Sequence, residues 1–412
     1  MSEAERVEEA KLKPITHLKE AVDLLLPQDR NLFFRLYELV DDRFMSDGSP
    51  RPNGHMKIPL EMREKVFRLF KDMVGSDDSD EVCKAVENQW TVFVTDRYSK
   101  RKAIFNPFRG SRPIDKNIRN FFLEDIEDQK KKSDCDFCHA ETSTPEGEFG
   151  RFKDDVGISF TNLTKFAPYH EIFAGPHNPY EMTEEDFISQ MKKALAYGHT
   201  VYNKDPEAIH LAWGMNFGYK AGASKVHQHS QVIVCRGMMH QSEAEEFHEA
   251  AKLYRKEYPN SDYLSDWLRV HEVLGLARHF DDPESHDGIW AVMSLTPSKE
   301  RHAIVIGSRN SGYDVSEKFA RYCWHLVNFM MKDSNEGGEG VMEFNTKLFM
   351  TPFGRGEEYW SDFPPMFTII DRGVSTAITS DFGFMETSGT VVLSTDPKII
   401  APKLFRSLAQ AA

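Results

Sequence analysis

The sequence has little positive charge and no long hydrophobic run, and each absence excludes a class of protein. Its 412 residues include 51 Lys and Arg against 65 Asp and Glu, which gives a formal net charge of −14. Sequence-independent nucleic-acid binding needs a basic surface that displaces counterions, so we expect no nucleic-acid partner. A small phosphate ligand stays compatible with this charge, because a pocket can be locally positive in an acidic protein. The chain has no stretch of about 18 uninterrupted apolar residues, so we expect no membrane-spanning helix.

Cysteine is also scarce. Five cysteines are too few, and odd in number, for the disulfide framework of a small secreted domain. The first residues, MSEAERVEEAKLK, are charged and lack the apolar core of a secretory signal. Hydrophobic residues at 40% and charged residues at 28% are ordinary for a globular chain. We therefore expect a soluble cytoplasmic protein whose length suits two or three packed units.

The N-terminal region is predicted to be helical. Apolar residues recur at three- and four-residue intervals over residues 18–26, 31–44 and 60–74. The Pro-, Gly- and Ser-rich stretch at 46–54, SDGSPRPNG, separates the second of these helices from the third. We interpret residues 1–89 as an N-terminal helical extension with no chemistry of its own.

Short β-rich runs dominate from residue 90 onward. TVFVTD and KAIFNPF, separated by a charged turn, predict a hairpin. Further strands are expected at 157–162, 170–175, 209–216 and 225–234, with a long helix over 184–203 among them. The pattern returns in the second half, with strands at 289–295 and 302–308, a helix over 315–331, and strands at 347–352, 365–371 and 389–395.

This recurrence, about 130 residues later, indicates a weak internal duplication. The sequence therefore predicts an α+β fold with two related halves, residues 90–240 and residues 241–412, each an antiparallel sheet with flanking helices.

The segment 216–234, NFGYKAGASKVHQHSQVIV, is the richest in chemistry. Its end favours an extended strand, in which alternate residues share a face at a spacing of about 6.6 Å. His227, His229 and Gln231 are therefore expected to point the same way, with Gln228 and Ser230 on the other face.

A loop of small residues precedes these histidines and includes Gly218, Gly222 and Ser224. Such a loop lets backbone N–H groups approach an anion closely. Two imidazoles and an amide beside it indicate phosphoryl or nucleotidyl chemistry. The alternative is a set of solvated polar side chains on an edge strand, and the adjoining loop favours the first interpretation.

The second cluster is Cys135-Asp-Phe-Cys138. A CxxC is a redox pair, half of a zinc site, or accidental. No thioredoxin-like βαβ pattern surrounds it, which disfavours the redox pair. A zinc site needs two more ligands, and His170, His177 and His227 are available.

A third cluster follows the predicted hairpin. Arg109 and Arg112, three residues apart at the end of a strand, have the chemistry to clamp phosphate oxygens. In isolation, the same two residues are also typical of a solvated surface turn.

Taken in order, PFRGSRP, CDFC, FTN, GPHN and the N-x-G, AGAS and HQHSQ elements resemble the galactose-1-phosphate uridylyltransferase family of the histidine-triad superfamily. The resemblance covers about residues 90–400 and implies two histidine-triad-like halves. In that superfamily a third histidine marks mainly nucleotide hydrolases. Glutamine in its place, here Gln231, marks transferases and phosphorylases.

The resemblance also implies roles for individual residues. His229 would be the nucleophile that takes a nucleoside monophosphate, and Gln231 would hydrogen-bond the transferred phosphoryl group. The remaining substrate contacts would come from Arg109, Arg112, Asn162, Asn216, Gly222 and Ser224. A structural zinc ion, carried by some family members, would be held by Cys135, Cys138, His177 and His227.

Some positions depart from the family pattern. HQH stands where the uridylyltransferases have HPH, and GPHN is one residue shorter than usual, so His170 could replace His177 as a ligand. The late H-x-x-x-H-x-H-F segment of the sugar transferases has no counterpart, since the matching region reads FPPMFTIIDRG. The end of the chain is more similar to phosphorylase-type relatives such as the plant ADP-glucose phosphorylases.

The leading hypothesis is therefore a nucleotidyltransferase or phosphorylase of carbohydrate metabolism. It would pass a nucleoside monophosphate from a nucleoside diphosphate sugar, through a covalent histidyl-nucleotide, to phosphate or a sugar 1-phosphate. A dinucleoside polyphosphate phosphorylase or hydrolase, and a catalytically silent nucleotide-binding scaffold, are the alternatives. The base, the sugar and the oligomeric state stay open, although relatives commonly form homodimers.

Overall fold

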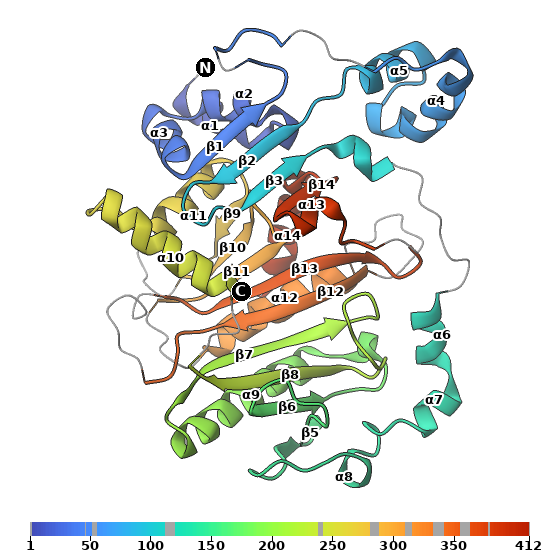
Figure 1. Ribbon diagram of the computed structural model, residues 1–412, viewed down its shortest axis with the longest axis vertical. Helices are drawn as coiled ribbons and strands as arrows, with labels where there is room; N and C mark the ends of the chain where they lie inside the picture. The colour runs from blue at the N-terminus through green and yellow to red at the C-terminus, as the bar shows by residue number, and fades with distance from the viewer. Residues whose placement is uncertain are drawn as a thin grey trace.

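A ten-stranded sheet forms the centre of the computed structural model (Figure 1). The structure describes residues 2–45, 47–51, 56–111, 120–237, 242–280, 288–309, 315–332, 342–354, 363–377 and 380–411; Arg112 lies outside them. Within these residues, helices and mainly antiparallel strands combine in an α+β fold, as the sequence predicted.

The two halves of the ten-stranded sheet repeat one topology. The first half contributes β4 (Lys153–Asp154), β5 (Gly157–Thr161), β6 (Tyr169–Ala174), β7 (Ala208–Phe217) and β8 (His229–Arg236). The second contributes β9 (Ala277–His279), β10 (Trp290–Met293), β11 (Ala303–Ile306), β12 (Met342–Phe349) and β13 (Met366–Val374). The order is β4-β5-β6-β8-β7 followed by β12-β13-β11-β10-β9, so each half swaps its last two strands.

A helix occupies the same place in each half. Helix α9 (Glu184–Lys204) connects β6 to β7, and α12 (Glu317–Lys332) precedes β12 after β11. The halves join edge to edge, because β7 pairs antiparallel with β12. The expected internal duplication is thus present as a repeated topology, and its consequence is one continuous sheet.

Both helices cover the same side of this sheet, behind the strands in Figure 1. Phe187 of α9 and Trp324 of α12 pack together, and Phe187 also contacts Trp213 of β7 and Phe367 of β13. Because side chains alternate along a strand, the neighbours of these residues in β7 and β13 point to the opposite side. We call that opposite side the front face.

A second sheet contains four strands in the described chain, in the order β1-β2-β3-β14. These are β1 (Tyr37–Asp41), β2 (Val92–Asp96), β3 (Lys102–Phe105) and β14 (Thr390–Leu393). Strands β2 and β3 form the predicted hairpin. Strand β14, from the end of the chain, lies parallel to β3.

One sequence prediction in the N-terminal region is wrong. The helix expected over 31–44 ends early, because α3 spans Pro27–Leu36 and Tyr37–Asp41 forms β1. Tyr37 and Leu39 alternate as in a strand, although the apolar residues of this segment also recur at helical spacing. Antiparallel pairing with β2 favours the strand over the helix. The other two helices are present as α2 (Leu18–Leu24) and α4 (Leu60–Val74).

The remaining helices surround the two sheets. They are α1 (Glu3–Leu12), α5 (Ser79–Glu87), α6 (Phe121–Glu127), α7 (Gln129–Ser133), α8 (Ala140–Ser143), α10 (Ser242–Glu257), α11 (Tyr263–Val273), α13 (Phe384–Thr387) and α14 (Pro397–Leu408). Short 3₁₀ turns lie at η1 (Ile15–His17), η2 (Pro107–Ser111) and η3 (Pro179–Glu181). Among the described residues, no helix combines the length and apolar character that crossing a membrane requires.

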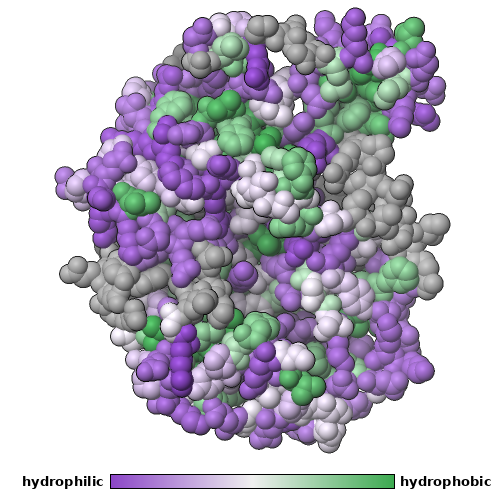
Figure 2. All heavy atoms as spheres, in the orientation of Figure 1, coloured by the Kyte–Doolittle hydropathy of each residue, from purple (hydrophilic) through white to green (hydrophobic). Residues whose placement is uncertain are grey.

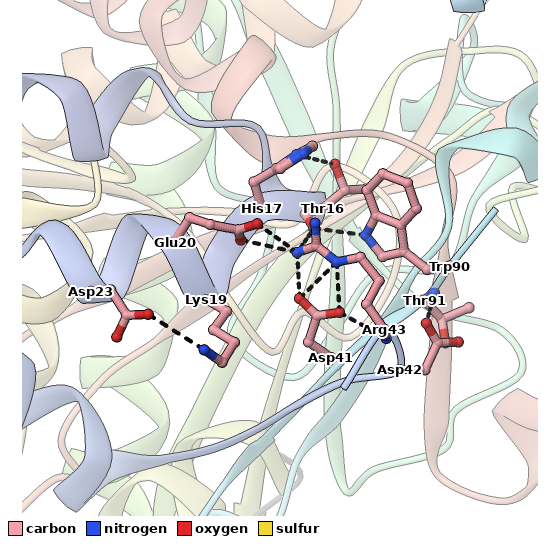
Figure 3. Close-up of polar contacts among 10 residues, drawn as sticks. All are labelled: Thr16, His17, Lys19, Glu20, Asp23, Asp41, Asp42, Arg43, Trp90 and Thr91. Atoms are coloured by element: carbon pink, nitrogen blue, oxygen red, sulfur yellow. Dashed lines mark hydrogen bonds and ion pairs between the residues drawn. The ribbon is translucent and has the colours of Figure 1, made fainter. Parts of the chain in front are cut away.

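Arg43 ties the N-terminal helices to the four-stranded sheet (Figure 3). Its guanidinium pairs with Asp41 at 2.5 Å and with Glu20 of α2 at 2.9 Å. It also lies 4.6 Å from the ring of Trp90, whose indole N–H donates to the carbonyl of Thr16 at 2.9 Å. The hydrogen bond to Asp41 is the main cause that raises the pKa of Arg43 further above its usual value. The N-terminal extension is therefore fastened to the sheet by charge-assisted contacts.

Glu171 of β6 is a buried acid on the helix side of the ten-stranded sheet. The hydroxyl of Ser159 donates to its Oε1 at 2.8 Å, and burial raises the pKa of this carboxyl from 4.5 to about 7. The charged form is disfavoured in the folded state, because desolvation outweighs the hydrogen bond.

This shift predicts a pH-dependent stability. A raised folded-state pKa means that stability is greatest below pH 4.5 and falls as the pH rises through about 7. Between pH 5 and 8 the wild type should lose about 3 kcal/mol more than Glu171→Gln, which cannot ionise. Urea unfolding of both proteins at the two pH values measures this, and equal losses would contradict the assignment.

Candidate active site

Strand β8 carries the predicted catalytic residues inside the sheet. It lies between β6 and β7, with His229 opposite Ala174 and Gln231 opposite Ile172 and Gly214. His229 and Gln231 are two residues apart and both lie on the front face. The strand is therefore not a solvated edge, and the alternative interpretation of these polar residues does not apply.

The other face of β8 is held to helix α9. Gln190 of α9 exchanges hydrogen bonds of 2.6 and 3.2 Å with Gln228, and Ser230 donates to Gln190 at 2.7 Å. All three side chains are buried. Because buried amides must keep their partners, this network fixes the strand against the helix. Gln228 and Ser230 thus face away from His229 and Gln231, as the alternation predicted.

His229 is buried, and one of its ring nitrogens is engaged. Nδ1 lies 2.8 Å from the carbonyl oxygen of His227. A carbonyl oxygen only accepts, so Nδ1 carries the proton and Nε2 keeps a lone pair. Burial, assisted by the charge of Lys225, lowers the pKa of His229 below 6.5, so the ring is neutral at pH 7. This is the state that a nucleophilic imidazole needs.

His170 of β6 contacts Gln231 across the strands. Its Nε2 lies 2.9 Å from Gln231 Oε1 and 3.3 Å from Asn162 Nδ2. A proton on Nε2 satisfies the shorter contact and leaves the amide N–H₂ of Gln231 available to a ligand. Burial lowers the pKa of His170, which keeps the ring neutral. This contact between His170 and Gln231 was missed from the sequence, because it depends on the register of β6 and β8.

The four residues proposed as metal ligands lie together. One donor atom from each of Cys135, Cys138, His177 and His227 falls within 4.8 Å of the others. Cys138 Sγ is 3.3 Å from His177 Nδ1 and 3.5 Å from His227 Nδ1, and Cys135 Sγ is 3.4 Å from the latter. Bond lengths of about 2.0–2.3 Å to a tetrahedral zinc ion place its ligands about 3.3–3.8 Å apart, so the group fits. His170 is not a member of this group.

His227 connects the cysteine–histidine group to His229. Its Nε2 donates to the carbonyl of Gly175 at 2.8 Å, which orients the ring so that Nδ1 faces the cysteines. Its own carbonyl accepts from His229. One residue therefore takes part in the metal-ligating group with its side chain and positions the neighbouring histidine with its backbone.

Two further residues around His229 were also missed from the sequence. Phe137, between the two cysteines, makes edge contacts with His229 and His227 at 5.3 and 5.7 Å between ring centroids. The ammonium of Lys225 lies 5.3 Å from the Phe137 ring and pairs with Asp136 at 2.6 Å. Lys225 could have been found from its position in the loop, directly after Ser224.

The glycine loop after β7 is held by a carboxylate from the second half. Gly218 and Gly222 have φ angles of +93° and +92°, which favour glycine. Glu343 of β12 is buried and accepts from the backbone N–H of Lys220. A Cβ on Gly218 would lie 2.4 Å from Glu343, so only glycine permits this approach.

The backbone N–H groups in the first part of this loop form hydrogen bonds within it, whereas those in its last part do not. The N–H groups of Gly222 and Ala223 bond inside the loop, to Tyr219 and Gly218. Those of residues 224–227 have no partner in the described part of the chain. The donors available to an anion therefore begin at Ser224, which is exposed, and lead directly to His229.

Asn216 lies at the junction of the two halves. Its side-chain oxygen Oδ1 accepts from the side-chain amide of Asn345 of β12 at 2.7 Å, and the same amide donates to the backbone carbonyl of Ala221 at 2.7 Å. Arg372 of β13 donates to Asn345 at 2.8 Å. The second half thus borders the site, a contribution invisible in sequence because these strands lie far apart along the chain.

The structure does not bring Arg109 to this group. Arg109 is exposed in η2, next to Phe108, which packs on Phe70 of α4. The chain just before η2 bonds β14, since the N–H of Asn106 donates to Leu393. Arg109 therefore lies with the four-stranded sheet.

No family model and no curated protein matches this sequence. Solved structures match its fold. An ADP-glucose phosphorylase from Arabidopsis thaliana with bound ADP-glucose has a TM-score of 0.54 at 15% identity, over 78% of this chain and 99% of its own. A GalT-like protein from Arabidopsis thaliana has a TM-score of 0.51 at 14% identity, over 76% and 97%. A uridylyltransferase has a TM-score of 0.50 at 11% identity, over 65% and 90%.

These structures share the fold at very low identity. The resemblance to the galactose-1-phosphate uridylyltransferase family, which rested on short motifs, is confirmed in the architecture. The likeness covers nearly the full length of each of the three chains.

Gly175 provides a test of how tightly β8 is positioned. A Cβ at Gly175 would lie 2.1 Å from Gln228 Oε1 and 2.7 Å from Gln190 Nε2. Gly175→Ala should therefore destabilise the protein by about 1–3 kcal/mol in urea unfolding. Gly110→Ala is the control, because its Cβ would meet no atom closer than 3.6 Å. Equal stability of the two variants would contradict the packing described here.

Proposed function

We propose that this protein is a nucleotidyltransferase or phosphorylase that moves a nucleoside monophosphate through a covalent intermediate on His229. The observation that carries the proposal is the hydrogen bond from Nδ1 of His229 to the carbonyl of His227, which leaves a neutral ring with a free lone pair on Nε2. The N–H groups of residues 224–227, without a partner in the described part of the chain, and the amide of Gln231 would bind the phosphoryl group.

In the first step, Nε2 of His229 attacks the α-phosphorus of a nucleoside diphosphate sugar. A P–N bond forms, and the bond from phosphorus to the bridging oxygen breaks. The sugar phosphate leaves as an anion and needs no proton. The positive charge on the ring is shared with Nδ1–H, which stays bonded to the His227 carbonyl.

In the second step, an oxygen of phosphate or of a sugar 1-phosphate attacks the same phosphorus, and the P–N bond breaks. His229 returns to its neutral form, so kinetics are ping-pong. Gln231 has no titratable proton, which makes water a poorly activated acceptor. Ser224 would donate a hydrogen bond to the phosphoryl oxygens, and the ammonium of Lys225, whose charge acts on His229, would stabilise their negative charge.

The proposal extends to the partners and the arrangement of the chain. The substrates are a nucleoside diphosphate sugar with phosphate or a sugar 1-phosphate, contacted by Asn162, Asn216 and Gly222, in a cytoplasmic protein. A dinucleoside polyphosphate is the second candidate donor, because it has the same α-phosphorus. Residues 90–240 are the reacting half and residues 241–412 the supporting half.

We also propose that Cys135, Cys138, His177 and His227 hold a zinc ion. Four protein ligands complete a tetrahedron and leave no position for water, so the ion is structural. When bound, the ion would hold the His227 side chain in addition to its hydrogen bond to Gly175, and the His227 carbonyl accepts from His229.

The covalent step predicts a mass change. Intact-protein mass spectrometry after brief incubation with UDP-, ADP- or GDP-sugars, without acceptor, should show a mass gain of one nucleoside monophosphate. The reason is that the histidyl-nucleotide intermediate accumulates when no acceptor removes it. The adduct should be acid-labile and absent in His229→Asn, whose turnover should fall by a factor on the order of a thousand or more. His325→Asn, on α12 behind the sheet, is the control and should keep the adduct.

The outcomes separate the candidates. An adduct from one sugar nucleotide identifies the base as well as the mechanism. An adduct from dinucleoside polyphosphates alone would select the second donor class. Nucleotide binding without any adduct would leave a silent scaffold and overturn the proposal.

The metal assignment predicts a loss of zinc. Cys135→Ser should lower the zinc content measured by elemental mass spectrometry and reduce thermal stability, because one of four ligands is removed. Cys235→Ser, a buried cysteine outside the group, should keep its zinc. Wild-type protein without zinc, purified without chelator, would refute the assignment.

A further inference from the structure

A cavity of about 340 Å³ lies on the front face of the second half. Its floor includes Asn345 and Lys347 of β12 and Thr368 of β13, and its wall includes Lys102 of β3. It therefore lies between the two sheets and opens to solvent, and its volume is within the range of about 300–1,000 Å³ that small-molecule sites occupy. Figure 2, in the orientation of Figure 1, shows hydrophilic and hydrophobic side chains interspersed over the middle of this side of the molecule.

Strand register places this cavity on the same face as His229 and Gln231. Gln231 is opposite Gly214, and Gly214 is opposite Lys347. Residues directly opposite each other share a face, so Lys347 and Gln231 point to the same side, two strand spacings or about 10 Å apart. The residue between them is Gly214, so no side chain projects from the sheet between Gln231 and Lys347 in this row.

Asn345 joins the two places directly. It lines the cavity and also donates to Asn216 and to the carbonyl of Ala221 in the loop before His229. A ligand in the cavity and a phosphoryl group at His229 would therefore contact opposite sides of one hydrogen-bonded unit.

The second half has no histidine on β13 beside Asn345. On β13, Ile370 pairs with Asn345. On β8, His229 lies opposite Asn216, as Ile370 lies opposite Asn345. This position is one residue beyond Met215 and Ser230, the last pair of β7 and β8. Ile370 cannot form a covalent intermediate, so this position of the second half supplies no nucleophile.

The charges of the cavity leave two ammonium groups available. Three carboxylates line it. Glu243 and Glu246 both pair with Arg101 at 2.7 Å, and Glu386 accepts from the backbone N–H of Gly383 at 2.9 Å. Lys102 and Lys347 are exposed and form no hydrogen bond or ion pair with any residue that the structure describes. The charge of Lys347 acts on Glu243 across the cavity. Two exposed ammonium groups that form no ion pair suit a phosphate group.

An exposed aromatic ring completes the lining. Phe382 is 55% exposed at the cavity, and the ammonium of Lys299 lies 4.9 Å above its ring. An exposed ring beside cations offers a packing surface for the ring of a sugar or a base next to its phosphate.

We propose that this cavity binds the part of the substrate that is not transferred to His229: a phosphate ester that carries a ring, held by Lys347 and Lys102. The proposal rests on the proposed function, since it assigns a place to the leaving and accepting groups of the same reaction. A sugar 1-phosphate and a nucleoside phosphate share this chemistry.

Binding without transfer tests the cavity independently of the reaction. Isothermal titration of His229→Asn with glucose 1-phosphate, with AMP and with inorganic phosphate measures affinity where no covalent step can occur. Adding Lys347→Met or Lys102→Met should weaken binding of the ester that occupies the cavity by about tenfold or more. Lys347→Arg should retain most of the affinity. Lys84→Met, on α5, removes the same charge elsewhere and is the control.

Each outcome decides a separate question. If the lysine substitutions lower the affinity for glucose 1-phosphate more than the affinity for AMP, the ligand of the cavity is a sugar phosphate. The reverse result identifies a nucleoside phosphate as the ligand. Equal affinity of Lys347→Met, Lys102→Met and Lys84→Met for all three probes overturns the cavity proposal, even if the wild type forms its adduct. Absence of the adduct in the wild type overturns the proposed function, whether or not the esters bind.

Discussion

The hydrogen bond between Nδ1 of His229 and the carbonyl of His227 is the contact on which the site depends, because it sets the tautomer and the direction of the ring. That carbonyl is itself held in place from two directions. The His227 side chain lies among Cys135, Cys138 and His177 and donates to Gly175. Behind the strand, Gln228 and Ser230 bond Gln190 of α9. The contacts that residues 227–230 make in the fold thus determine the direction of Nε2 of His229.

Duplication explains how the two halves came to have unequal tasks. Both have the same strand order and the same helix position, and they join through β7 and β12 into one sheet. The first half carries His229, whereas the second has Ile370 beside Asn345. The second half nevertheless supplies Glu343 to the glycine loop and Asn345 to Asn216. Joining edge to edge lets the second half contribute residues to the site of the first half.

Local patterns were enough for much of the fold and of the site. Alternation along β8 correctly separated His229 and Gln231 from Gln228 and Ser230, and periodicity located helices such as α4 and α9. The helix expected through Phe44 was wrong after Leu36, because pairing with β2 outweighs a local preference that fits both structures. The contact of His170 with Gln231 and the contact of Asn345 with Asn216 could not be predicted, because both depend on strand register.

By itself the sequence determined the chemistry available: a pair of histidines and an amide at alternate positions of a strand, a CxxC with histidines at hand, and a glycine loop before them. These motifs can be identified from residue types and short spacings, because residues a few positions apart are kept close together by the covalent chain. Only the tertiary structure decided that His177 joins the cysteines while His170 turns to Gln231, and that Lys347 shares a face with His229. Such choices depend on which strands become neighbours, and that is settled by burial and pairing over the whole chain.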